Sequence, residues 1–506
     1  TRMYYTLGCE GSRQKFATQP NGDVFMTENF IKVAPGKDTP RLAWDEGELQ
    51  VKLGFPAVEP GLREIEEGYL PVIRTVWMEA GVVYEQEAYA TWLWGTTPGV
   101  RREGDDPVIA MLQVRLSNLT SQPRQAALQV ESCIRDGKAD TLIEDQGWIT
   151  TFTGHLRMLF DTHGQGRLSA DAGRVHYQVV LPAGEAHTLT LKLAHLDLNQ
   201  PEERARIAAL DYAAEKQQVL AYWRERTHQG AQLITPNQTL DSFYRTHLMH
   251  MLVINDREPG ADRQVARCGG FYYGSFPDEG CMAITDLDRR GYHAEAERCL
   301  DLYVTYQGAA PLPGNFQSQE GVFYGSGGYE VAGYNRNHGW VMWNLAGQYR
   351  YTRDRAWPES VAPALVKACD WITRERQVTL RPGSIQYGFL PSGSLEDVTD
   401  YWTWLPTNAY ASWGFRAAAE VLAEIDHPEA ARLAREATEY TRDLTVGFYE
   451  VCARSPVVAL RNGTAVPHFP ARQERRGRDF GWLREVLEGA GHLVYCGLIA
   501  SDSLPA

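Results

Sequence analysis

The sequence changes character at Pro201, and this change limits the possible folds more than any other feature. Before Pro201, short runs of alternating or β-branched and aromatic residues recur, as at 82–91 and 108–116, with turn signals such as Asn21-Gly22 between them. Such runs predict many short antiparallel strands, and no strand–helix alternation suggests a parallel sheet. We therefore expect the N-terminal part to be an antiparallel β-sandwich.

After Pro201 the pattern becomes helical, beginning with a run that continues to Trp223. The connections between the later helices alternate between very short and long, and the long ones are rich in Gly, Tyr, Trp and acidic residues. Loops of this kind are usually functional. The alternation predicts helical hairpins whose long loops share one rim, and a ring of six such hairpins is an (α/α)6 barrel. The expected helices span residues 238–255, 279–290, 293–307, 339–353, 357–376, 400–425, 427–453 and 482–499.

The length of 506 residues requires more than one domain, because single cores stop growing near ~250–300 residues. We predict a β-sandwich over 1–198, a linker helix over 199–235 and an (α/α)6 barrel over 236–506. About eight helices can be placed, whereas six hairpins need twelve. We therefore expect a barrel that is incomplete at its C-terminal end, with the remaining helices supplied by a missing C-terminal segment or by another chain.

Charge and composition exclude several classes of partner. The chain carries 50 Lys and Arg against 64 Asp and Glu, a formal charge of −14, and no basic stripe. We therefore expect no nucleic-acid partner. No run approaches the ~18 apolar residues of a membrane helix, so we expect no membrane partner either.

The eight cysteines form no CxxC pair, so buried thiols are expected and no metal site. No cofactor motif is present. Unpaired cysteines and a start at Thr1 without a signal peptide favour the cytoplasm, and an oligomer remains possible.

Three segments of the helical half carry a family resemblance. They are the stretch 339–354 followed by Trp357 and Asp370-Trp371-Ile372, the segment Phe276-Pro-Asp-Glu-Gly280, and Asn408-Ala-Tyr410 before Trp413-Gly-Phe. Together with the domain order, they resemble the six-hairpin glycosidase superfamily, which includes glucoamylase-like and processing α-glucosidase-like glycoside hydrolases. Pro277 departs from the pattern, since the related segment has Trp there. The resemblance in domain order covers nearly the whole chain.

The resemblance implies that 236–506 is a catalytic domain and that the substrate is a carbohydrate. It implies a glycoside hydrolase that cleaves an oligo- or polysaccharide by carboxylate acid/base catalysis, with inversion favoured. Two alternatives stay open at this point. One is a glycoside phosphorylase on the same fold, and the other is a non-catalytic carbohydrate-binding homologue.

The loop before the sixth expected helix holds the candidate catalytic residues. Glu396, Asp397 and Asp400 lie within five residues and are followed by Trp402 and Trp404. The resemblance places the general acid here, at Glu396 or Asp397, and the catalytic base beyond Ala506. Crowded carboxylates raise one another's pKa, as a general acid near neutral pH requires. The alternative is a solvated acidic turn that caps the next helix.

Further candidates for substrate binding lie in the same loops and at the helix starts. Asp278 and Glu279 either accept hydrogen bonds from sugar hydroxyls or stabilise a helix N-terminus. His338 either contacts substrate or fills the start of a helix, and no metal-ligand pattern surrounds it. The substrate-binding candidates are Asp278, Glu279, Tyr329, Glu330, Asn337, His338, Trp340, Asp400, Trp402 and Trp404.

The last long loop carries four arginines between Arg472 and Arg478. They either recognise a carboxylate or phosphate group bidentately or form a basic surface turn that pairs with Glu474 and Asp479.

Overall fold

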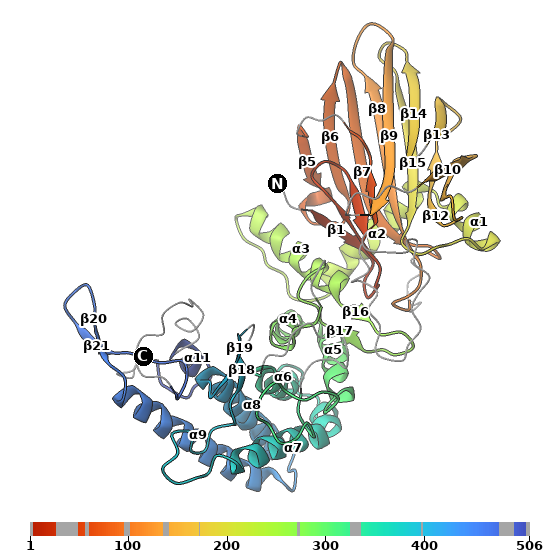
Figure 1. Ribbon diagram of the computed structural model, residues 1–506. Coiled ribbons are helices and arrows are strands. Elements are labelled where there is room, and N and C mark those ends of the chain that lie inside the picture. Colours follow the sequence, from red (N-terminus) through yellow and green to blue (C-terminus); the bar gives the residue numbers. More distant parts are fainter. Residues whose placement is uncertain are drawn as a thin grey trace. The chain divides into compact units, whose positions relative to one another are not determined.

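The structure is a computed structural model in which the chain forms two compact units (Figure 1). One unit comprises Thr1–Asp262 with Gly269–Tyr273, and the other comprises Arg263–Cys268 with Gly274–Ala506. The structure describes residues 4–26, 49–55, 60–95, 102–134, 141–171, 173–270, 274–323, 335–395, 398–474 and 490–501.

The first unit is built on two antiparallel sheets. One has seven strands in the order β1-β2-β3-β4-β9-β14-β13, and the other has eight in the order β10-β11-β12-β15-β8-β7-β6-β5. The strands are β1 Tyr5–Gly8, β2 Lys15–Thr18, β3 Val24–Met26, β4 Leu49–Lys52, β5 Leu62–Ile65, β6 Ile73–Glu79, β7 Val82–Trp92, β8 Val108–Asn118, β9 Arg124–Ile134, β10 Leu142–Asp145, β11 Trp148–Thr151, β12 Leu156–Asp161, β13 Arg167–Asp171, β14 Arg174–Leu181 and β15 Ala186–Ala194.

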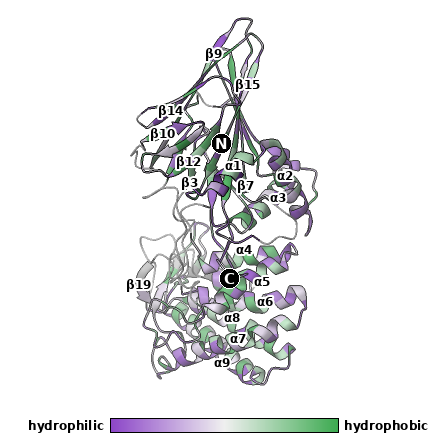
Figure 2. Ribbon diagram, turned by 90° about the vertical axis from the view of Figure 1, so that its right-hand side faces the viewer, coloured by the Kyte–Doolittle hydropathy of each residue, from purple (hydrophilic) through white to green (hydrophobic). Residues whose placement is uncertain are grey.

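The two sheets pack face to face around an apolar core. The ring centroids of Phe160 in β12 and Tyr177 in β14 are 5.9 Å apart, which joins one sheet to the other. Along β14 buried and exposed residues alternate, as expected for a strand with one face in the core. Figure 2 shows hydrophobic residues beside hydrophilic ones along the strands. The predicted β-sandwich is confirmed.

Helices cover the outer face of the eight-stranded sheet. The ammonium group of Lys192 in β15 donates to the backbone oxygens of Ile207 and Leu210, at 2.9 and 2.7 Å, where α1 (Pro201–Ala209) ends. The hydroxyl of Tyr89 donates to the backbone oxygen of Tyr212, the first residue of α2 (Tyr212–His228), at 2.6 Å. These contacts explain why β7 and β15 are buried on both faces near these helices.

The linker prediction needs correction in one respect. The single helix expected from Pro201 to Trp223 is two helices, because the chain bends between α1 and α2. Asp211 caps the second helix and accepts a hydrogen bond from the backbone nitrogen of Ala214 at 2.8 Å. The next helix, α3 (Gln238–Ile254), also belongs to the first compact unit, whereas the sequence placed residues after 235 with the barrel.

The second unit consists of helical hairpins. Short turns connect α4 to α5, α6 to α7 and α8 to α9, and the segments between hairpins are long. Helices α4, α6 and α8 contact one another in that order. The described helices of this unit are α4 Pro277–Arg289, α5 His293–Thr305, α6 Asn337–Thr352, α7 Ala356–Gln377, α8 Leu405–Glu424, α9 Ala430–Ala453 and α11 Ala490–Tyr495.

Short strands accompany the helices. They are β16 Asp256–Arg257 in the first unit, and β17 Gln264–Val265, β18 Gly393–Leu395, β19 Val398–Trp402, β20 Val457–Ala459 and β21 Ala465–Pro467 in the second. One helix start was predicted wrongly. The helix expected from residue 400 begins at Leu405, because Val398–Trp402 pairs with β18 and Pro406 stands in the first turn.

Two glycines allow α6 and α8 to approach closely. A Cβ atom added to Gly339 of α6 would lie 2.1 Å from the backbone oxygen of Tyr410 in α8. On the facing helix, a Cβ atom at Gly414 would lie 2.5 Å from the backbone oxygen of Gly339. Both contacts are with backbone atoms, so neither neighbour can swing away. This packing fixes the distance between the two helices whose N-termini follow the long loops.

We predict that Gly339→Ala lowers the free energy of unfolding by ~1–3 kcal/mol, because the added methyl group forces the helices apart. Gly347→Ala in the same helix is the matched control, since a Cβ atom there meets nothing within 4 Å. That substitution should raise the free energy of unfolding by ~0.4–1 kcal/mol. Urea denaturation followed by circular dichroism measures both. Equal effects of the two substitutions would contradict the close approach.

Candidate active site

The long loops of the second unit meet at one end of the hairpins. The segments 306–336 and 378–404 each run from the end of one hairpin to the N-terminus of α6 or α8. Since α4, α6 and α8 contact one another in order, their N-termini define a common rim. We call the segments 306–336 and 378–404 the second and third rim loops.

A buried carboxylate anchors the second rim loop. Glu375 of α7 is 1 % exposed and accepts hydrogen bonds from the backbone nitrogens of Gln317 and Ser318 at 2.9–3.0 Å. The indole nitrogen of Trp371, one turn earlier, donates to the backbone oxygen of Ser318 at 2.7 Å. Burial raises the pKa of Glu375, while the two backbone donors favour its charged form. The loop backbone is therefore bound by side chains of α7.

An amide side chain holds the third rim loop to two helices. The Oδ1 atom of Asn408 in α8 accepts from the backbone nitrogen of Leu390 and from the hydroxyl of Tyr440 in α9, both at 2.8 Å. Its Nδ2 atom donates to the backbone oxygen of Trp404 at 2.7 Å. Asn408 is 2 % exposed, so replacing it would leave several buried polar groups without partners.

A buried ion pair completes this attachment. The guanidinium of Arg376 donates to Asp443 of α9 at 2.8 Å and to the backbone oxygen of Gly388 at 2.7 Å. It also lies over the ring of Tyr440, 4.4 Å from the centroid. Gly388 has a φ of +75°, and a Cβ atom there would lie 2.8 Å from Asp443. The ion pair and the glycine thus determine where the third rim loop turns.

The second and third rim loops also bind each other. The backbone nitrogen of Asn315 donates to the oxygen of Ser392 at 2.8 Å, and that of Ser394 donates to the oxygen of Pro313 at 2.9 Å. Gly393 stands at this contact, and a Cβ atom there would lie 2.0 Å from the amide nitrogen of Asn335. These contacts join residues 313–315 of the second rim loop to residues 392–394 of the third.

The third rim loop ends in a hairpin beside two indoles. In this β18–β19 hairpin, Gly393 pairs with Trp402 and Leu395 pairs with Val398. The indole of Trp404 is 1 % exposed and donates to the backbone oxygen of Gly393 at 3.0 Å. Trp402 is partly buried, and its indole nitrogen is buried without a hydrogen-bond partner among the described residues. The hairpin is thus fixed to the start of α8.

Arg472, from the last long loop, packs against both indoles of this hairpin. Its guanidinium lies 4.5 Å from the ring centroid of Trp402 and 5.2 Å from that of Trp404. It is 3 % exposed, so at this residue the arginine-rich segment is not a solvated surface turn. Glu474 accepts from the backbone nitrogen of Thr403 at 3.0 Å and from the side-chain amide of Gln386 at 2.8 Å, and the other three arginines of this segment lie outside the described residues.

Several predicted site residues lie outside the described residues. They are the candidate catalytic residues Glu396 and Asp397 and the candidate substrate-binding residues Tyr329 and Glu330. Asp400 belongs to β19, but its side chain is outside the described part.

Asp278 forms an ion pair that joins the first turn of α4 to the start of α6. Its Oδ2 atom accepts from Arg336 at 2.8 Å, while its Oδ1 atom is buried and has no hydrogen-bond partner in the described part of the chain. The N-cap position belongs to Phe276, so Asp278 is not the capping residue. The neighbouring Glu279 is exposed. The two adjacent carboxylates therefore occupy different environments.

Asn337 is the first residue of α6 and directly follows Arg336 in the sequence. It is also fully buried. Among the described residues, neither polar atom of its side-chain amide has a hydrogen-bond partner. Buried polar groups without partners are costly and mark places where a ligand, water or rearrangement supplies the missing bond. Asp278 and Asn337 are both 0 % exposed, so only a local rearrangement would bring either into contact with a substrate.

His338 and Trp340 are packed into the helical core. The Nδ1 atom of His338 accepts from the backbone nitrogen of Phe323 at 2.9 Å, so its Nε2 atom donates to the oxygen of Ala368 at 3.3 Å. Trp340 stacks on Tyr410 of α8 with centroids 5.3 Å apart. Both are nearly inaccessible, and we do not carry them into the proposed site.

Sequence reasoning missed Arg336 and the loop anchor Glu375, and it did not foresee that Arg472 packs against two indoles or that Asn408 anchors a loop. No local spacing connects Arg336 with Asp278, since 58 positions separate them. The only sequence signal for Glu375 is that an acidic residue occupies the otherwise apolar face of the expected helix.

Within the described residues, no group of three or more His, Cys, Asp or Glu could hold a metal ion. No helix there has both the length and the apolar character needed to cross a membrane.

We predict a pH-dependent contribution of His338 to stability. Burial lowers its pKa to about 3, against ~6.5 in the unfolded chain. The unfolded state therefore binds an extra proton between these values, and stability falls as pH drops from ~6.5 toward 3. His338→Gln should remove up to ~1.4 kcal/mol of this loss per pH unit. Denaturation curves at several pH values measure the difference, and identical slopes for both proteins would contradict it.

We predict that Arg336→Met lowers the free energy of unfolding by ~3–5 kcal/mol, because it leaves the charge of Asp278 buried without its partner. Adding Asp278→Asn should recover part of this loss. Denaturation of the two single variants and the double variant gives the coupling energy. Additive effects would show that the ion pair contributes nothing specific.

The comparisons with known proteins support the architecture. No protein-family model matches the sequence, and no curated protein matches it. A bacterial glucoamylase solved with acarbose superposes with a TM-score of 0.53 at 11 % identity, covering 94 % of this chain and 70 % of its own.

Two further solved structures superpose less closely. A protein assigned as a kojibiose phosphorylase from the human microbiome has a TM-score of 0.48 at 9 % identity, covering 87 % of this chain and 67 % of its own. A family GH92 inverting mannosidase from Bacteroides thetaiotaomicron has a TM-score of 0.44 at 10 % identity, covering 98 % and 69 %. At such identities the likeness concerns the fold. The chain thus shares the fold of the bacterial glucoamylase, an antiparallel β-sandwich followed in sequence by (α/α) helical hairpins.

Proposed function

We propose that this protein is a glycoside hydrolase whose active site lies at the rim formed by the second and third rim loops. Glu396 or Asp397 is the general acid in this proposal. The observation that supports it is the β18–β19 hairpin, whose two strands directly precede and follow these two residues in the sequence. Its flanking residues Leu395 and Val398 are paired, and Trp404 and Arg472 pack against the hairpin. Catalytic groups need such rigid support.

The chemistry requires two carboxyl groups with different tasks. One donates a proton to the leaving glycosidic oxygen, and a carboxylate activates water or attacks the sugar. Inverting enzymes hold the two about 6.5–9.5 Å apart so that a water molecule fits between them. We propose inversion for this protein. A general acid that works near neutral pH needs a raised pKa, and like-charge repulsion between neighbouring carboxylates is one physical cause of such a shift.

Trp402, in the hairpin, supplies a sugar contact in this proposal. Its side chain is partly exposed, so part of its ring can contact a sugar. The guanidinium of Arg472 lies 4.5 Å from the centroid of this ring and holds it in place. Aromatic faces with a few placed polar groups are typical of sugar sites.

We predict that the double variant Glu396→Gln, Asp397→Asn loses ~10²–10⁴-fold in hydrolysis rate on any oligosaccharide the protein cleaves, because general acid catalysis contributes that much. The single variants assign the proton donor. Glu424→Gln is the matched control, because Glu424 lies on α8 and its exposed carboxylate pairs with Arg353 at the end of α6. Unchanged hydrolysis in the double variant would overturn the assignment of the acid.

A glycan hydrolysis screen with and without inorganic phosphate identifies the reaction class. Hydrolysis independent of phosphate supports the proposal, whereas phosphate-dependent release of a sugar 1-phosphate would replace it with a phosphorylase. Proton NMR of the first product determines whether the anomeric configuration is inverted. Sugar binding without turnover would indicate a non-catalytic carbohydrate-binding protein.

A further inference from the structure

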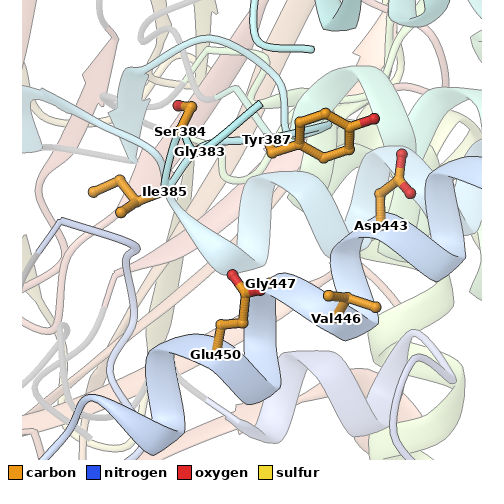
Figure 3. A pocket seen from close by; sticks show the side chains of 8 residues that line it. All are labelled: Gly383, Ser384, Ile385, Tyr387, Asp443, Val446, Gly447 and Glu450. Atoms are coloured by element: carbon orange, nitrogen blue, oxygen red, sulfur yellow. The ribbon is translucent and has the colours of Figure 1, made fainter. Parts of the chain in front are cut away.

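A cavity of about 360 Å³ lies between the third rim loop and α9 (Figure 3). One side is formed by residues 383–385 and Tyr387 of the loop, and the other by Asp443, Val446, Gly447 and Glu450 of α9. The four helix residues follow one another at helical spacing, so a single face of α9 forms this wall. Of the sequence-predicted site residues that the structure describes, none is among the lining residues.

The lining combines apolar surface with hydrogen-bonding groups. Ile385, Tyr387 and Val446 are exposed by 40–53 %, although they are large apolar or aromatic side chains. Ser384, Glu450 and the phenol group of Tyr387 supply donors and acceptors around them (Figure 3). A sugar presents hydroxyl groups at its edges and C–H groups at its faces, and it needs this mixture.

The charge of Asp443 at the cavity wall is compensated. Asp443 is paired with Arg376 at 2.8 Å and with Arg442 at 3.0 Å. The exposed Glu450 is the other lining carboxylate, and the lining residues include no cationic side chain. An anionic ligand would be repelled, and a cationic one could gain only from the exposed Glu450, where solvent weakens the attraction, whereas a neutral polar ligand fits the lining. The volume suits one or two sugar rings.

We propose that this cavity is a binding subsite for a neutral carbohydrate, separate from the candidate catalytic hairpin. The floor is preformed, because the Arg376–Asp443 pair and Gly388 hold the turn of the loop against α9. The cavity wall formed by the third rim loop is also linked to the β18–β19 hairpin. Gln386 donates to Glu474 at 2.8 Å, and Glu474 accepts from the backbone nitrogen of Thr403. A bound sugar thus restrains the loop that leads to Glu396 and Asp397.

Hydrogen–deuterium exchange of the whole chain with neutral gluco-, manno- and galacto-oligosaccharides of two to four sugars tests the proposal. We expect slower exchange in peptides covering 383–387 and 443–450 for at least one of these sugars. Tyr387→Ala and Glu450→Gln should each weaken binding at least tenfold, measured as the sugar concentration for half-maximal protection. Tyr449→Ala is the matched control, because Tyr449 is an exposed tyrosine of α9 outside the cavity lining.

Each outcome decides the proposal. It is overturned if no sugar protects these peptides, if the lining variants bind like the wild type, or if glucosamine or glucuronic acid oligomers bind more tightly than neutral ones. Thermal melting of the variants checks that they fold. The Glu396→Gln, Asp397→Asn variant should keep the protection at 443–450 even though it loses hydrolysis. Failure of the hydrolase proposal and failure of the subsite are therefore distinguished.

Discussion

The candidate active site depends on polar side chains that are buried in the helices and bind the backbone of the rim loops. A long loop that packs against helices buries peptide N–H and C=O groups, and each needs a partner. Glu375 supplies acceptors for the second rim loop, and Asn408 and Arg376 supply an acceptor and donors for the third. Without these groups the loops would lose hydrogen bonds that water cannot replace at such depth.

The position of the helices is as important as these anchors. Gly339 and Gly414 allow α6 and α8 to approach until their backbones touch. The starts of the two helices therefore lie close together, and the loops that precede them meet, as the contact between Asn315 and Ser392 shows. A wider helix spacing would separate the loops and the groups they carry.

One set of contacts serves both proposed sugar sites. The Arg376–Asp443 pair forms the floor of the cavity on α9 and also fixes the turn of the third rim loop at Gly388. The same loop continues into the β18–β19 hairpin. The cavity and the hairpin are therefore supported by one network, although different residues line them.

Much of the fold could be predicted from the sequence. Alternation over 108–116 predicted β8, and the helical period over 357–376 predicted α7, because in both segments the residues that face the core repeat with the period of the element. The predictions failed where the period is interrupted. Residues 400–402 belong to β19 rather than to α8, since strand pairing with β18 overrides local helical preference.

The site was less predictable, because its contacts join residues far apart in the chain. The sequence by itself determined the two-part architecture, the alternating loops and the acidic and aromatic character of the third rim loop. Only the tertiary structure paired Asp278 with Arg336, placed Arg472 against Trp402 and enclosed His338 among backbone partners. The physical reason is that periodicity reports which side of an element faces the core. It carries no information about which distant polar group will share that burial.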